Sequence, residues 1–286
     1  MTLNTNATTS WAAKWFGPML QETLKNALVA EKICKVDRSN SKYIWNPYTS
    51  AVTTTIQAIA GTYSVATPTF STDDTLTVAD EFIYGEHIYD YEFLSQKTDI
   101  GEARMKEIVS SIATAIDKFV VNNLLEDGTG AYTTPIGGFT TAANVHTIIG
   151  DLWTKFAGYI TNFDNPYLVI ESTDVTGFYQ AGVTTGFNTA DAWYNNGWIG
   201  NFGGFDVYVL RAGTFVTATL GTTTVSNAGR RLAGIPGIST YCQPREVKWE
   251  EKGVSGKTGY EVMAVGYIGF KLWNAKAALT VDILLG

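Results

Sequence analysis

The clearest structural signal in this 286-residue chain is residues 98–125, TDIGEARMKEIVSSIATAIDKFVVNNLL. Asp99, with Glu102 three positions later, forms a capping pattern at a helix start, and Gly128 is suited to follow the helix end. The pattern predicts one helix from Asp99 to Leu125, about 40 Å long at roughly 1.5 Å per residue. Its apolar positions recur every three or four residues along one face: Met105, Ile108, Val109, Ile112, Ile116, Phe119, Val120 and Leu124.

The segment before this helix, residues 43–96, carries the whole net charge of the chain. It contains seven acidic residues and no Lys or Arg, so the other 20 acidic residues balance the 20 basic ones elsewhere. Its Thr-, Val- and Tyr-rich composition with turn signals predicts a long β-hairpin. Monomeric proteins usually place charged residues, especially Lys, on exposed strand edges, where they prevent pairing with other chains. Residues 43–72 have no charged side chain. We therefore predict an arm that lies on a neighbouring subunit; a hairpin packed on its own domain is the alternative.

The return limb of this hairpin is predicted over residues 82–93, FIYGEHIYDYEF, where alternation gives two faces. Ile83 and His87 point to one face together with later aromatic residues. The acidic side chains point to the other, and they would need a basic surface on the neighbouring subunit. The acidic face comprises Glu86, Asp90 and Glu92, and the predicted basic surface comprises Arg230, Arg231, Arg245 and Lys248.

The rest of the chain mixes helices and strands without regular βαβ order, which predicts the α+β class. A helix is predicted before the arm, over Pro18–Cys34, from its apolar spacing. After the long helix, strands are predicted at 131–140, 166–171, 205–210, 245–251, 259–272 and 278–284, helices at 143–161 and 174–180, and loops at 181–203 and 212–229.

Composition narrows the classes of function. Charged residues make up 16% of the chain and the net charge is −7, which argues against a protein that binds the phosphates of nucleic acids. Cys34 and Cys242 have no metal-ligand spacing and are predicted to be buried thiols. The first residues lack a signal-peptide pattern, and no stretch reads as a membrane span of about 18 apolar residues. We expect a soluble protein made in the cytoplasm, with no membrane partner.

No motif predicts a catalytic residue, a cofactor or a metal. Residues 256–258, Gly-Lys-Thr, resemble the end of a phosphate-binding loop, but position 251 is Glu and a strand follows. A hairpin turn between two strands fits this segment better. Alternation separates His87 from Glu86, so no metal ligands converge there. The aromatic-rich residues 192–205 leave open an alternative, a carbohydrate-binding tail protein or adhesin.

The order of these elements resembles the major capsid proteins of tailed bacteriophages, whose fold is called Hong-Kong-97-like. Residues 98–125 resemble the spine helix of that family, and NPYLVIESTDVTGFYQAG (165–182) resembles the strand-then-helix entry of its axial domain. Residues 259–284, GYEVMAVGYIGFKLWNAKAALTVDIL, resemble its closing strands. The resemblance implies an N-terminal arm at 1–42, an extended β-hairpin loop at 43–96, a peripheral domain at 97–141 and 244–286, and an axial domain at 142–243.

The resemblance implies a structural role rather than catalysis. Subunits would form the hexamers and pentamers of an icosahedral head that is assembled in the host cytoplasm. The head would enclose double-stranded DNA, contacted weakly and non-specifically, with a portal and a separate scaffolding protein as partners. Some members cross-link through a Lys in the extended loop; residues 43–96 have none, so we expect non-covalent joining. An encapsulin-like compartment shell is an alternative. The implied aromatic anchors are Trp45, Tyr63, Phe70 and Tyr84.

Overall fold

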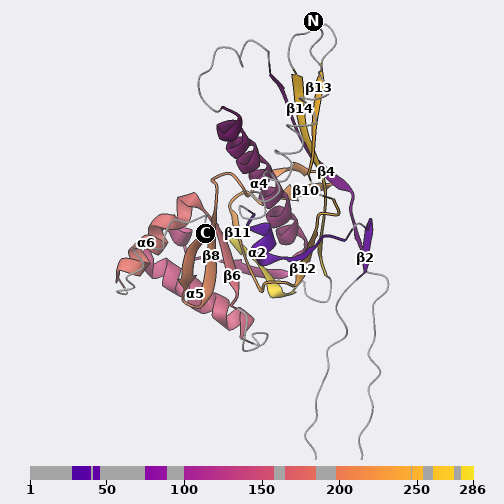
Figure 1. The fold of residues 1–286 in the computed structure, drawn as a ribbon. Helices are drawn as coiled ribbons and strands as arrows, with labels where there is room; N and C mark the ends of the chain where they lie inside the picture. The colour runs from indigo at the N-terminus through magenta and orange to yellow at the C-terminus, as the bar shows by residue number, and fades with distance from the viewer. Residues whose placement is uncertain are drawn as a thin grey trace, which may run out of the picture.

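A computed structural model describes residues 28–39, 41–45, 75–88, 100–157, 165–184, 198–245, 247–253, 260–273 and 278–286. Their helices are α2 (Ala30–Ile33), α4 (Ile100–Asp127), α5 (Ala142–Phe156) and α6 (Val175–Thr184), with short 3-10 helices η1 (Gly138–Thr140) and η2 (Ser172–Asp174) (Figure 1). The strands are β1 (Lys35–Asp37), β2 (Tyr43–Trp45), β3 (Thr75–Thr77), β4 (Asp80–Ile88), β5 (Gly130–Thr133), β6 (Tyr167–Glu171), β7 (Trp198–Phe202), β8 (Phe205–Leu210), β9 (Thr217–Leu220), β10 (Thr223–Ser226), β11 (Arg230–Gly234), β12 (Ser239–Cys242), β13 (Lys248–Gly253), β14 (Tyr260–Leu272) and β15 (Thr280–Leu284).

The long helix predicted over Asp99–Leu125 is confirmed as α4, which crosses the centre of the molecule (Figure 1). From Ile108 to Leu124 its apolar stripe is buried, and Ile116 and Leu124 have no exposed surface. The sequence predicted no membrane span, but Glu107–Asp127 is long and apolar enough to cross a membrane by length and composition alone. However, 72% of that window is buried inside the chain itself. This is the burial of a core helix.

A six-stranded sheet in the order β5-β15-β11-β6-β8-β7 separates two hydrophobic cores. Every residue of β6 is buried. Tyr167 and Val169 belong to the core around α4, whereas Leu168 and Ile170 belong to the core under α5 and α6. A strand covered on both faces needs such an unbroken apolar run. The sheet also joins β5 and β15, from the predicted peripheral ranges, to strands of the predicted axial range.

α5 and α6 cover one face of this sheet (Figure 1). The prediction of a loop over 181–203 is wrong at both ends of that range, because α6 continues to Thr184 and β7 pairs with β8. Gly203 and Gly204, with φ of 59° and 87°, close the β7–β8 hairpin. Consecutive positive φ values are typical of tight hairpin turns. The glycines that suggested a loop are therefore the turn between two strands.

The second sheet is built along β14, a 13-residue strand. β12 and β13 pair antiparallel with it, β1 pairs parallel with β12, and Gly253 pairs with Tyr260, which confirms the predicted hairpin. The strand predicted over residues 82–93 is confirmed as far as Ile88, within Asp80–Ile88, but it packs on its own domain, as in the alternative prediction, and not on a neighbouring subunit. These residues form β4 and pair with β14 of the same chain. This pairing satisfies their backbone and packs Phe82 and Tyr84 against the α4 core, which a free hairpin could not do.

The uncharged segment 212–229, predicted as a surface loop, contains a β-hairpin instead. β9 and β10 pair antiparallel around Gly221, whose φ is 60°. The turn is held from outside, because the backbone N–H of Thr222 donates to Oδ1 of Asp80 at 2.7 Å. Thr favours strands over loops, so the Thr-rich composition fits the observed hairpin.

The strand predicted over 131–140 ends early, since β5 stops at Thr133. Pro135 has no N–H to donate, and Gly137 adopts a φ of 89°, so the chain turns into η1. We call residues 134–138 the Ile136 loop. Several other predictions lie outside the described residues: most of the helix Pro18–Cys34, the contact residues Tyr63 and Phe70, and the acidic residues Asp90 and Glu92.

Candidate functional site

The candidate functional site is a set of exposed surfaces. Across the described ranges, no group of three or more His, Cys, Asp or Glu side chains is arranged to hold a metal. Large hydrophobic side chains that stay exposed on ordered elements are candidate contacts for another protein. They are Tyr43, Trp45, Ile83, Ile136, Tyr179, Tyr267 and Leu284.

Two of these side chains project from β2. Tyr43 and Trp45 are 54% and 64% exposed, and they alternate with Ile44, which packs inward against the buried cluster of Leu76, Cys242 and Trp273. β2 pairs antiparallel with β3, with Trp45 opposite Thr75. The aromatic rings therefore stand on a strand ladder that is fixed to the core. Trp45 and Thr75, which flank residues 46–74 in the sequence, are therefore neighbours across this ladder.

β4 and β14 form a surface with an inner and an outer face. On the inner face Tyr84 is half-buried against the α4 core, and its hydroxyl donates to Oε2 of Glu86 at 2.6 Å. On the outer face Ile83 is 60% exposed and Tyr267 is 46% exposed. The prediction chose Tyr84 as an aromatic anchor, whereas Ile83 is the large apolar side chain of this strand that faces outward.

Arg231, predicted as part of a basic surface, is buried instead, with 4% exposed. Its guanidinium pairs with the carboxylate of Glu171 at 3.2 Å and, through Nε, with that of Asp174. It also donates to the carbonyl of Arg230 at 2.7 Å. A guanidinium matches carboxylates with several donors, so burial is compensated by pairing. Arg231 thus offers no charge to a neighbouring subunit.

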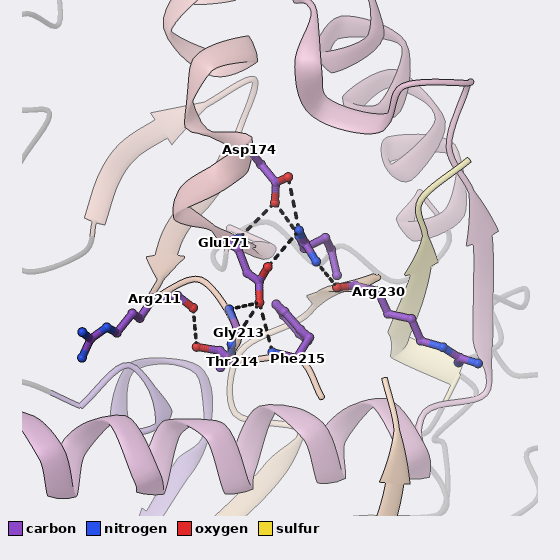
Figure 2. Close-up of polar contacts among 8 residues, drawn as sticks. Glu171, Asp174, Arg211, Gly213, Thr214, Phe215 and Arg230 are labelled. Carbon is purple, nitrogen blue, oxygen red and sulfur yellow. Dashed lines mark hydrogen bonds and ion pairs between the residues drawn. The ribbon is translucent and has the colours of Figure 1, made fainter. Parts of the chain in front are cut away.

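Glu171 is held by a loop as well as by Arg231. Figure 2 shows the backbone N–H groups of Gly213, Thr214 and Phe215 converging on its carboxylate, at 3.0, 3.0 and 3.2 Å. The Phe215 ring lies 5.3 Å from the guanidinium carbon of Arg231. These donors stabilise the second carboxylate of a buried cluster that has only one cation.

The same loop is fixed to α4 from the other side. Asn122, fully buried on α4, donates to the carbonyl of Thr214 at 2.8 Å and accepts the N–H of Val216 at 3.2 Å. Asn227 donates to the carbonyl of Asn122 at 2.9 Å. The polar network therefore connects α4 to β6 and, through Asp174, to the start of α6. It fixes the two cores relative to each other.

The remaining predicted basic residues lie at the surface. Arg230 pairs with Asp282, and 35% of its side chain stays exposed. Arg245 and Lys248 are exposed. Burial raises the pKa of Asp282, and the charge of Arg230 opposes that shift. Three of the four predicted basic residues can therefore be reached from solvent.

A second buried network anchors α2 to α4. The carboxylate of Asp117 accepts the N–H groups of Val29 at 3.2 Å and Ala30 at 2.8 Å. Burial raises the pKa of Asp117 to about 7, although these hydrogen bonds oppose the shift. Cys34 and Cys242 are buried free thiols, as predicted, and burial raises the pKa of Cys34 to about 12. Neither thiol has the features of a nucleophile.

No protein-family model and no curated protein matches the sequence. Solved structures match its fold. The chain is similar to the capsid protein of cyanophage P-SCSP1u, with a TM-score of 0.65, 12% identity, and coverage of 91% of this chain and 89% of that one. For the mature capsid of bacteriophage PhiM1, the TM-score is 0.56 at 10% identity, covering 90% and 87%. For a virus-like particle from Pyrococcus furiosus, it is 0.57 at 9% identity, covering 94% and 97%. The predicted α+β fold is confirmed as the fold of these proteins.

Proposed function

We propose that this chain is the major capsid protein of a tailed bacteriophage, a structural subunit located in the virion. The observation that carries the proposal is the shared fold over 91% of this chain and 89% of a cyanophage capsid chain. In this proposal copies of the chain form the hexamers and pentamers of an icosahedral head.

The proposed regions of the subunit are those predicted from the sequence. Residues 43–96 form the extended loop, 97–141 and 244–286 the peripheral domain, and 142–243 the axial domain, with an N-terminal arm at 1–42. The β2–β3 ladder supports an extended loop, because it closes the ends of the intervening chain with Trp45 exposed beside it. The pairing of β4 with β14 of the same chain removes Asp80–Ile88 from the projecting part of this range.

The proposed contact joins the acidic loop of one copy to a basic surface of the next. Arg245 and Lys248 are exposed and suit this role, whereas the buried Arg231 does not. Opposite charges would orient the approach, and aromatic side chains such as Trp45 would supply buried area. The extended loop lacks Lys, so the joining is non-covalent. A portal, a separate scaffolding protein and weakly held double-stranded DNA complete the proposed partners.

Electron microscopy of the purified chain over a range of concentrations tests this function. We expect rings of five and six subunits or closed shells, free of covalent multimers on a denaturing gel. A chain that stays monomeric at high concentration would exclude the proposal. Particles from infected cells should contain double-stranded DNA; a protein cargo without DNA would favour the encapsulin-like alternative. Binding to a glycan array without any assembly would favour the adhesin.

A charge-reversal experiment tests the contact itself. The double variant Asp90→Lys/Glu92→Lys should assemble poorly, because like charges would then face each other. Combining it with Arg245→Glu/Lys248→Glu should restore assembly, since the charges are exchanged between the two surfaces. Normal particles from the first variant, or no recovery in the combined one, would contradict this pairing.

A further inference from the structure

Ile136 is the most exposed large hydrophobic side chain of the described residues, with 93% of its surface open. It lies at the tip of the Ile136 loop, between β5 and η1. Single exposed apolar residues are common on protein surfaces, so exposure alone assigns no role. The distinguishing feature is how firmly the loop is held around this side chain.

Gly286 is joined to the Ile136 loop by two hydrogen bonds. The N–H of Gly137 donates to the carbonyl of Gly286 at 3.2 Å, and the N–H of Gly286 donates back to Oγ1 of Thr134 at 2.9 Å. A Cβ at Gly286 would meet the carbonyl oxygen of Thr134 at 2.5 Å, so the two segments touch closely. The loop is therefore tied to the end of β15 as well as to β5.

The loop is also closed from within and from α5. The N–H of Gly138 donates to the carbonyl of Pro135 at 3.0 Å, which forms a turn around Ile136. The side-chain amide of Asn144, on α5, donates to the carbonyl of Ile136 at 3.1 Å. Gly137 and Gly138 both have positive φ, which favours glycine. A loop whose backbone is ordered before binding loses little backbone conformational entropy when it is buried.

The residues next to the Ile136 loop in sequence favour an apolar partner. Residues 128–150 contain no charged side chain. The charged residues next to this range are Asp127 and Asp151. Asp151 accepts the Tyr132 hydroxyl at 2.8 Å, and Lys155, one turn further along α5, donates to the carbonyl of Ala131 at 2.9 Å. Residues 128–150 themselves offer no cationic side chain to neutralise the phosphates of a nucleic acid. The complementary surface is therefore an uncharged protein surface.

The loop lies at the lateral edge of the six-stranded sheet. β5 is the outermost strand, and within the described chain it pairs with β15 alone. α5 and α6 cover one face of the sheet and α4 covers the other, so both faces are occupied by the chain itself. Leu284, 46% exposed at the end of β15, adds apolar surface beside the loop. An edge of this kind is open to a neighbour that approaches sideways.

We propose that the Ile136 loop is a subunit contact in which Ile136 inserts into an apolar surface of a second copy of this chain. The inference rests on the proposed function, because in a shell the neighbour at a lateral edge is another copy. It adds a contact formed by a rigid turn, separate from the acidic loop and its basic surface. Since Ile136 is exposed in the single chain, its role lies in assembly and leaves folding unaffected.

Site-specific photo-cross-linking on the full chain tests this contact. p-Benzoylphenylalanine is placed at position 136 and, as a control, at the exposed His146 of α5. Irradiation of assembled particles should give a product of twice the chain mass from position 136, at least fivefold above the control. The product should disappear after dilution into the unassembled state, and peptide mapping should identify both partners as this chain.

A substitution provides an independent measurement. Ile136→Asp should reduce particle yield at least tenfold without changing the thermal midpoint of the unassembled chain, and Ile136→Leu should restore the yield. Shells that form normally with Ile136→Asp, or that give no dimeric product from position 136, overturn this inference alone. A cross-link to a different protein also overturns it. A chain that forms neither rings nor shells overturns the proposed function, and this contact with it.

Discussion

The carboxylate of Asp117 in α4 accepts the backbone N–H of Ala30 at 2.8 Å, across 87 positions of sequence. This buried hydrogen bond joins α2 to the long helix. The burial of the carboxyl group, which the hydrogen bond opposes, makes Asp117 sensitive to pH. Burial raises the pKa of Asp117 from 3.8 to about 7. The folded chain therefore holds this proton more tightly than the unfolded chain does.

Stability should fall as the pH rises. Below about pH 4 Asp117 is protonated in both states, so its contribution is complete. Between about pH 4 and 7 the unfolded chain alone loses the proton, and above pH 7 the contribution is gone. From this group we expect the unassembled chain to be about 2–3 kcal/mol less stable at pH 8 than at pH 5. Urea denaturation at the two pH values measures it.

Asp117→Asn is the control for this pH dependence. The variant cannot titrate, so the difference between pH 5 and pH 8 should shrink by most of that amount. An unchanged difference in the variant would assign the pH dependence to other groups.

Replacing Arg231 should destabilise the fold strongly. Arg231→Ala leaves Glu171 and Asp174 buried without their cation, which costs about 3–5 kcal/mol in comparable buried pairs. The neighbouring Arg230→Ala is the matched control, because its pair with Asp282 is partly exposed to solvent. The control should cost less than about 1 kcal/mol. Denaturant unfolding of both variants gives the comparison; equal losses would contradict the distinct roles of the two arginines.

Two helix glycines should respond in opposite directions to alanine. A Cβ at Gly177 in α6 would lie 1.8 Å from the carbonyl oxygen of Phe139, so α6 must move away from η1. We expect Gly177→Ala to destabilise the chain by about 1–3 kcal/mol. Gly150 in α5 has nothing within 4 Å of such a Cβ, and Gly150→Ala should stabilise by about 0.5–1 kcal/mol. Thermal unfolding distinguishes them; a stable Gly177→Ala would mean that the close approach is not present.

Trp45→Ala should weaken assembly and leave folding intact. The side chain is 64% exposed in the single chain, and buried Trp anchors contribute about 2 kcal/mol or more to interfaces. The concentration needed for assembly should then rise about 30-fold. Light scattering against concentration measures this, with Thr77→Ala on the same ladder as control. Assembly of Trp45→Ala at the wild-type concentration would remove Trp45 from the interface.

Periodicity predicted the elements that have long, regular patterns. α4, β14 and β15 lie within a few residues of their predicted bounds because each carries an apolar repeat of its own period. The pairing of β4 could not be predicted in this way. Alternation tells which side chains share a face, but the partner strand β14 lies more than 170 positions later.

The arginine pair shows a second limit. Arg230 and Arg231 are adjacent in sequence, yet one is at the surface and the other is buried with Asp174, 57 positions away. A period-of-two interpretation of RRLAG places Arg231 on the face of Ala233 and Arg230 on the face of Leu232, and both of these apolar residues are fully buried. Alternation therefore could not tell which arginine is buried. The carboxylates that make its burial tolerable were not identifiable without the fold.

The position of β6 between two cores has a mechanical consequence. Tyr167 and Val169 pack in one core, and Leu168 and Ile170 pack in the other. Unfolding either core would displace β6 and so expose the apolar side chains of the other core. The two layers should therefore melt together, as one calorimetric transition rather than two. Force applied to α4 would be transmitted to α6 through this shared strand. We therefore expect this part of the chain to move as a single rigid unit.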